Sequence, residues 1–319
     1  MKMKELMDEF VKEEKRDNRF KSLTQEDYDK FDFTKNTDAL EFLLYVSEKN
    51  KNNNVKYFIQ SIYQLDDFFR WCKRKNVEDV TPLDFKEINF DALLDSFVLA
   101  SGLTFIDKTM ILRILNYVDK KQNQHRSFIS KEYVKFIIAA SYNGISFSEL
   151  VKLKKNKFED LVCWQQKFLI NSYKKYVNSE KNIGNVQFED YLLYYSPKKY
   201  DYKKYHDRAK VSMQRQYLQN INNSGINITL NMILYSGFIA YVRTQCESNE
   251  EFVNLFTLIF KDRKKIEKVD NMRLLNYANK FFVLKNFKYE WQVVDLKYTC
   301  FVLLRKTQWY EDYITNNNC

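Results

Sequence analysis

Hydrophobic residues recur at helical spacing along most of the chain. The segment 55–75 shows this best, since one stripe of it holds Phe58, Ile62, Leu65, Phe68, Phe69 and Cys72. Similar stripes over 38–49, 90–99 and 105–121 predict a small helical bundle. Residues 3–16 predict a short amphipathic helix, which could pack on its own body or on a neighbour.

The second half of the chain continues the helical pattern. Helices are predicted over 131–141, 147–153, 205–220, 229–243, 249–262, 269–281 and 292–315. The first two meet at Asn143-Gly144, where the glycine supplies a positive φ for a sharp turn. Aromatic and β-branched residues alternate loosely over 163–173, which favours strand there. With 5 Gly and 2 Pro in 319 residues, turn formers are too scarce for an all-β protein, so a mainly α fold is predicted.

A polar, aperiodic stretch at 122–127 interrupts these patterns and marks a domain boundary. We therefore expect an N-terminal helix and connector over 1–36, a first helical domain over 37–121, a linker over 122–129 and a second domain over 130–319. Ser130 is the expected N-cap of the helix that opens the second domain.

Charge is distributed unevenly along the chain. Residues 1–50 carry 10 basic and 13 acidic groups, residues 51–125 carry 11 and 10, and residues 126–319 carry 31 and 19. The balances of −3, +1 and +12 place the net charge of +10 in the C-terminal part. Such clustering favours a polyanionic partner such as nucleic acid, although a basic face that only keeps the protein in solution is the alternative.

Several other classes of protein are disfavoured. No stretch approaches the roughly 18 uncharged apolar residues of a membrane span, and the N-terminus has no apolar signal core, so we expect a cytoplasmic protein with no membrane partner. The five cysteines stand singly, and His125 and His206 are the two histidines. Because this spacing suits neither a metal site nor a catalytic triad, we expect no cofactor and no metal.

Two segments resemble the catalytic boxes of tyrosine recombinases, the phage integrase family. Residues 133–153 match an apolar helix followed by the family's Gly-x-Arg-x-x-Glu-Leu-x-x-Leu turn, and the matching residues are Gly144, Glu149, Leu150 and Leu153. Ser146 stands where the family has its first catalytic arginine. Residues 228–237 resemble the His-x-x-Arg box, with Asn231 in place of the histidine and Leu234 in place of the second arginine.

The resemblance implies a two-domain architecture, with a core-binding-like helical bundle followed by a mostly helical catalytic-like domain that has at most a small β-sheet. Tyr277 would stand near the place of the nucleophile; a packed aromatic is the alternative reading. Strand cleavage needs guanidinium groups on the scissile phosphate, which Ser146 and Leu234 cannot provide, so no enzyme is expected.

Inactive members of this family act as DNA-binding regulators, and the chain is most similar to the lysogeny repressors of SPβ-type prophages. The resemblance thus implies a sequence-specific double-stranded DNA-binding protein, a phage transcriptional repressor that maintains lysogeny on repeated operator-like elements. One alternative is an active recombinase that uses Arg113, Arg126, Arg208 or Arg243 instead. Another is a protein-interaction or RNA-binding helical module.

The expected DNA contacts are exposed cations, most of which would touch phosphates. In the first domain they are Arg70, Lys73, Arg74, Lys108 and Arg113, and in the second Lys152, Lys154, Lys155, Lys198, Lys199, Lys203, Lys204, Arg208 and Arg215. Alternatively, the cations that end segment 55–75 complement a helix dipole, and 198–204 is a solvated loop. Homo-oligomerisation, by exchange of the N-terminal helix or the tail 309–315, and a regulatory protein partner stay open.

Overall fold

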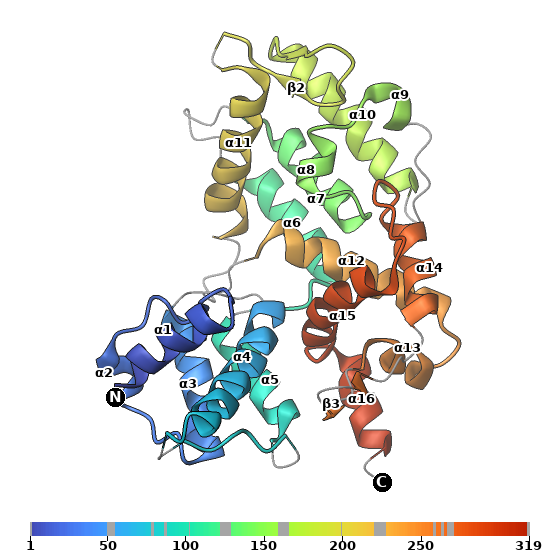
Figure 1. The fold of residues 1–319 in the computed structure, drawn as a ribbon. Helices are drawn as coiled ribbons and strands as arrows, with labels where there is room; N and C mark the ends of the chain where they lie inside the picture. Colours follow the sequence, from blue (N-terminus) through green and yellow to red (C-terminus); the bar gives the residue numbers. More distant parts are fainter. Residues whose placement is uncertain are drawn as a thin grey trace. The chain divides into compact units, whose positions relative to one another are not determined.

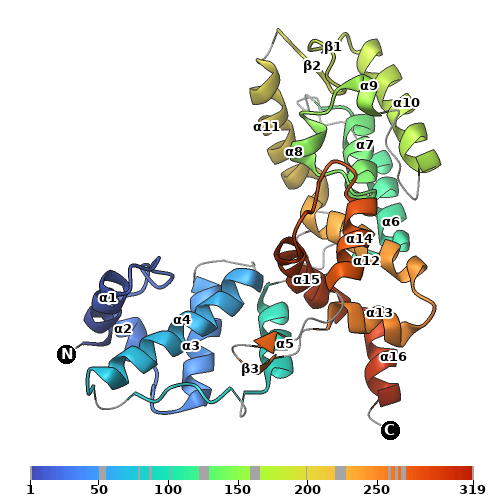
Figure 2. The same ribbon diagram turned by 45° about the vertical axis from the view of Figure 1, so that its right-hand side comes forward.

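The computed structural model describes residues 2–49, 55–77, 80–85, 88–101, 103–121, 129–158, 166–198, 200–219, 228–257, 260–262, 265–266 and 271–317. The chain forms two compact units, drawn in Figures 1 and 2. Unit 1 comprises Met1–Gly102 and Leu258–Lys268, and unit 2 comprises Leu103–Thr257 and Val269–Cys319. Both are mainly helical, which confirms the prediction of a mainly α fold. None of the described helices is long and apolar enough to span a bilayer.

Unit 1 is built around the amphipathic helix that was predicted over residues 55–75. Its helices are α1 (Met3–Glu13), α2 (Gln25–Tyr28), α3 (Asn36–Lys49), α4 (Val55–Arg74) and α5 (Phe90–Ser101). The predicted stripe of α4 is buried, with Phe68, Phe69 and Cys72 fully enclosed. Phe10 of α1 packs against Phe68 and Trp71 of α4, so the N-terminal helix lies on its own unit.

Unit 2 contains the remaining helices and one of two short hairpins. Its helices are α6 (Lys108–Lys120), α7 (Lys131–Tyr142), α8 (Phe147–Leu150), α9 (Lys155–Phe158), α10 (Gln166–Asn182), α11 (Tyr202–Met213), the π-helix η1 (Gln214–Leu218), α12 (Leu230–Gln245), α13 (Asn249–Phe256), α14 (Asn271–Phe281), α15 (Glu290–Leu304) and α16 (Gln308–Asn317). β1 (Val186–Gln187) pairs antiparallel with β2 (Tyr194–Tyr195). The second hairpin, β3 (Phe260–Asp262) with β4 (Lys265–Ile266), groups with unit 1.

Helix α7 is the central element of unit 2. Ser130 caps it by accepting a hydrogen bond from the Tyr133 amide at 2.9 Å. Residues 136–142 are all buried, and α7 packs against α6, α8, α10 and α12. A helix that is apolar nearly all round belongs in the interior of a layered domain, as observed.

Two glycines allow the backbone to approach α7 and the turn after it. Gly144 has a φ of +89°, and a Cβ there would lie 2.2 Å from the carbonyl oxygen of Phe281 at the end of α14. Gly237 of α12 faces the end of α7, where a Cβ would lie 2.2 Å from the carbonyl oxygen of Tyr142. Glycine at these two positions therefore fixes how closely α12 and α14 pack on the α7 turn.

The division between the units differs from the predicted boundary. The compact units separate at Gly102 and Leu103, whereas residues 122–128 of the predicted linker lie outside the described residues. Helix α6, expected in the first domain, belongs to unit 2 because its buried side chains face α7 and η1. The Ile106 amide also donates a hydrogen bond to the Ser236 hydroxyl of α12 at 2.9 Å.

Three local predictions are wrong, and the first is the helix expected over 249–262, which ends at Phe256 and is followed by strand β3 (Phe260–Asp262). Strand was expected over 163–173, but the described part of this region is the start of helix α10. Leu169, Tyr173 and Tyr176 of α10 fall at helical spacing and pack toward α7. Spacing of i, i+4 and i+7 puts them on one face, which outweighs β-propensity. The single helix expected over 292–315 is two helices, α15 and α16, and Thr307 begins the second by accepting from the Tyr310 amide at 3.3 Å.

Candidate nucleic-acid interface

Three of the five cations predicted in the first domain lie at the end of α4, and two of these three have acidic partners within unit 1. The Nε of Arg70 donates to the fully buried carboxylate of Asp66 at 2.9 Å, and Arg74 donates to Glu14 of α1 at 3.0 Å. Lys73 is exposed. In the described structure, Arg70 and Arg74 thus each have an acidic partner within unit 1, and both side chains are exposed.

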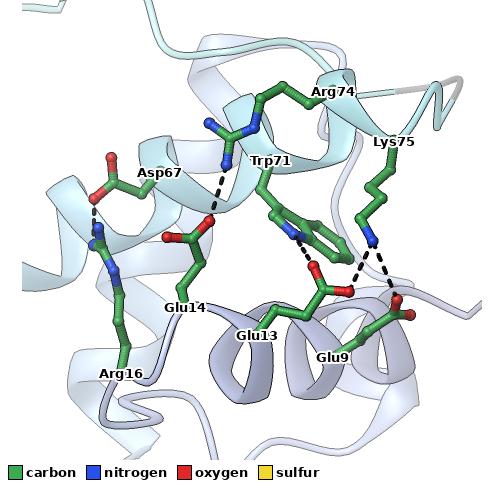
Figure 3. Close-up of polar contacts among 8 residues, drawn as sticks. All are labelled: Glu9, Glu13, Glu14, Arg16, Asp67, Trp71, Arg74 and Lys75. Atoms are coloured by element: carbon green, nitrogen blue, oxygen red, sulfur yellow. Dashed lines mark hydrogen bonds and ion pairs between the residues drawn. The ribbon is translucent and has the colours of Figure 1, made fainter.

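Figure 3 shows how the same tip of α4 holds α1. Lys75 lies 2.8 Å from Glu13 and 3.8 Å from Glu9, and the indole nitrogen of Trp71 donates to Glu13 at 2.9 Å. These hydrogen bonds, that of Lys75 first, hold the pKa of Glu13 below its usual value. The acidic groups of the N-terminal helix therefore neutralise the basic end of α4.

In unit 2 the predicted cations lie on exposed surfaces instead. Helix α11 begins where Asp201 accepts from the Lys204 amide at 2.8 Å. Tyr205, His206, Ala209 and Met213 form its buried side, while Lys203, Lys204, Arg208 and Lys210 are exposed. The guanidinium of Arg208 lies 4.5 Å from the ring centre of Tyr200 and donates to its hydroxyl.

Helix α8 lies beside α11, as Figure 2 shows, and two contacts join the two segments. The hydroxyl of Tyr202 donates to the carbonyl of Val151 at 2.8 Å, immediately before Lys152. Lys210 places its amine 5.8 Å from the ring centre of Phe147, the first residue of α8. These two contacts join α11 to the α8 region, and they place Lys210, with Lys203 seven residues before it, on the side of α11 near that region.

We call the exposed cations of these two segments the basic face; they are Lys152, Lys154, Lys155, Lys203, Lys204, Arg208 and Lys210. On α11, Lys204 and Arg208 lie on a different side of the helix from Lys203 and Lys210, because positions one or two residues apart do not share a helical face. All seven side chains are exposed, and within the described part of the chain none forms an ion pair. Six of them are among the predicted contacts. Lys210 was missed, although its position seven residues after Lys203 puts it on the same face of a helix.

The remaining predicted contacts lie outside the basic face or outside the described residues. Lys198 is exposed ahead of α11, and Lys199 lies outside the described residues. Lys108 and Arg113 are exposed on α6, and hence in unit 2 rather than in the first domain. Arg215 is exposed in η1.

Helix α11 rests on a buried polar cluster. Tyr133 and the Nδ1 of His206 share a hydrogen bond of 2.9 Å, and burial lowers the pKa of His206 to about 3. Nearby in the fold, Glu180 accepts from Ser130 and from Asn185, the latter at 2.7 Å, and burial raises its pKa. Burial therefore shifts the pKa of each of these two groups in the direction that favours its neutral form.

The residues in the recombinase-like frame make structural contacts. Ser146 is the N-cap of α8, in a reciprocal capping box with Glu149, whose carboxylate accepts from the Ser146 amide at 2.8 Å. Leu234 is 2% exposed in the core, and Asn231 is exposed in the first turn of α12.

Tyr277 lies at the other end of α12. Its hydroxyl accepts from the Nε of Arg273 at 3.1 Å and donates to the carbonyl of Gln245 at 3.4 Å. Asn231 and Gln245 are 14 residues apart on one helix, or about 20 Å along its axis. The structure therefore does not bring Tyr277 and Asn231 together.

The alternative arginines also belong to separate elements. Arg113 is on α6, Arg208 on α11 and Arg243 near the end of α12, where it donates to the carbonyl of Cys246 at 3.3 Å. Arg126 lies outside the described residues.

No protein-family model matches the chain, and searches among curated proteins and among solved structures find no similar protein. The resemblance to tyrosine recombinases therefore rests on residues 133–153 and 228–237 alone.

Proposed function

We propose that the chain is a sequence-specific binder of double-stranded DNA that holds the duplex on the basic face of unit 2 and does not cut it. One observation carries the proposal. Seven exposed cations come from two segments about fifty residues apart in sequence that contact each other, and these cations form no ion pair among the described residues.

The chemistry of this surface suits a phosphate backbone. Lysine ammonium groups on exposed stems can follow successive phosphates, and releasing counterions from DNA makes the affinity steeply dependent on salt. Phosphate contacts fix the position of a duplex, whereas sequence is read by a few groups at base edges. The contrast with the paired cations at the tip of α4 favours unit 2 as the main contact.

Binding without cleavage follows from the residues in the recombinase-like frame. Loss of one preorganised donor to a developing charge costs a factor of roughly 10² to 10³ in rate, and the frame lacks two arginines. A neutral capping serine and a buried leucine occupy their places. The separation of Tyr277 from Asn231 is a further reason to expect that the chain does not cleave DNA.

The biological role in the proposal comes from the resemblance. A recombinase-like protein that binds operators without cutting them would serve as a phage repressor that maintains lysogeny, acting in the cytoplasm on the host nucleoid. Repeated operator-like elements are the expected partner.

A binding selection with the full-length chain tests the proposal. Random duplexes are incubated with the protein, recovered and sequenced, and the recovered sites are then offered as suicide substrates that trap a 3′-phosphotyrosine. We expect a short recurring motif and no covalent adduct. Binding without any motif would overturn sequence specificity, and an adduct lost in Tyr277→Phe would establish the alternative, an active recombinase.

A further inference from the structure

An open pocket of about 410 Å³ in unit 2 takes no part in the proposed function. It lies where the ends of α12 and α13 face the C-terminal helix α16, and it is lined by Arg243, Asn249, Trp309, Asp312, Thr315 and Asn316. On α16, the spacing of Trp309, Asp312 and Asn316 puts these three side chains on one helical face.

The walls of the pocket are held in place by contacts away from its lumen. Asn249 donates from Nδ2 to the carbonyl of Trp309 at 2.6 Å, and the hydroxyl of Tyr313 donates to Asn254 at 3.0 Å. The indole of Trp309 packs edge-on against Phe252 at 5.5 Å. The pocket is therefore preformed, as small-molecule sites usually are.

Two polar atoms of its lining are buried without partners. The Nε of Arg243 and the Oδ1 of Asn249 have no hydrogen-bond partner within the described residues. Buried polar atoms are partnered in the great majority of cases, so these two enclosed atoms mark a polar wall whose hydrogen-bonding capacity is not used within the described residues.

The charges of the lining are also opposite and separate. Arg243 and Asp312 both line the pocket, yet neither forms an ion pair in the described part of the chain. Arg243 lies over the Phe252 ring at 5.8 Å, which supports the guanidinium in its position. A ligand that bridges the two must carry an anion at one end and a cation at the other.

We propose that this pocket binds a zwitterion, either an α-amino acid or a short unblocked peptide, with its carboxylate on Arg243 and its ammonium on Asp312. A guanidinium binds a carboxylate through charge-assisted hydrogen bonds. Trp309 offers apolar surface to a ligand side chain. A phosphate ester is disfavoured, because its negative charge would meet Asp312. This proposal does not rest on DNA binding.

Thermal-shift and calorimetric titrations of the full-length chain test the proposal. The probes are the common amino acids, their dipeptides with alanine, and inorganic phosphate. We expect at least one zwitterion to raise the melting temperature, and its N-acetylated and C-amidated forms not to. Tighter binding of dipeptides would show that the natural ligand is a short peptide, and tighter binding of free amino acids would show that it is an amino acid.

Variants assign the binding to this pocket. Arg243→Met and Asp312→Asn should each raise the Kd for that probe by about tenfold or more, whereas the exposed control Lys306→Gln should leave the Kd unchanged. Because Asp312 is exposed, its variant tests the site even where Arg243→Met impairs folding. The proposal fails if no zwitterion binds, if the blocked forms bind equally well, if phosphate binds instead, or if Asp312→Asn leaves the Kd unchanged.

Discussion

Three glycine-to-alanine substitutions separate the two reasons for glycine in unit 2. Gly184 has a φ of +75° but open space around its Cβ position. Gly237 sits in a helix, and its Cβ would clash with a carbonyl oxygen at 2.2 Å. Gly144 has both problems, a φ of +89° and a carbonyl oxygen at 2.2 Å.

The expected costs follow from these geometries. A left-handed backbone costs an alanine roughly 1 kcal/mol, so Gly184→Ala should lower the free energy of unfolding by about 1 kcal/mol. Overpacking against backbone costs about 1–3 kcal/mol, part of which the better helix propensity of alanine offsets in Gly237→Ala. Gly144→Ala adds strain to overpacking without that offset, so we expect a loss of about 3 kcal/mol.

Amide hydrogen exchange of the α7 segment is the suitable assay, because it reports opening of unit 2 alone, even where the two units unfold separately. Protection of residues 133–142 should fall most in Gly144→Ala. If Gly144→Ala costs no more than Gly184→Ala, the packing of α14 on this turn is not what the structure implies.

Three further substitutions test other parts of the account. Phe10→Ala should lower the free energy of unfolding of unit 1 by about 3 kcal/mol and expose α1 to proteolysis, because the Phe10 side chain is 1% exposed. A rate of cleavage within residues 3–13 equal to that of the wild type would contradict this. Burial lowers the pKa of His206 to about 3, so its contribution to stability is full above its unfolded pKa near 6.5 and is lost as the pH falls from there toward 3. The urea midpoint of the wild type should therefore fall between about pH 7 and 4, and His206→Gln should make this fall smaller. Glu180, whose pKa burial raises, changes stability with pH in the opposite sense, but it is present in both proteins and so cancels when the two are compared. Asp207 is exposed on α11 between Lys203 and Lys210, so Asp207→Asn should tighten duplex binding at low salt; weaker binding would argue against a phosphate contact there.

Sequence patterns predicted those features that depend on local spacing. The apolar stripe of α4 and the cap at Ser130 follow from residues within a few positions of one another. The membership of α6 does not, because a stripe such as Ile111, Ile114 and Val118 says which side is buried but not which helix covers it.

Long-range pairing also limited the prediction of the site. The sequence shows a basic end on segment 55–75, but not that Glu14, sixty residues before Arg74, occupies it. Lys203 and Lys152 are fifty-one residues apart, and the hydrogen bond from Tyr202 to Val151 that makes them neighbours is a tertiary contact. Charge composition could thus indicate the region of the interface but not its boundary.

The salt dependence of duplex binding tests the central claim most directly. Fluorescence anisotropy would give the Kd for one duplex over a range of salt for the wild type, for Lys203→Gln/Lys210→Gln, and for the control Lys288→Gln/Lys306→Gln, which removes two exposed charges elsewhere. If all seven cations of the basic face neutralise phosphates, log affinity falls with log salt with a slope of up to about −6, and the first variant makes this slope shallower by about 2 while the control does not. Equal slopes for the wild type and Lys203→Gln/Lys210→Gln would contradict DNA binding on this face.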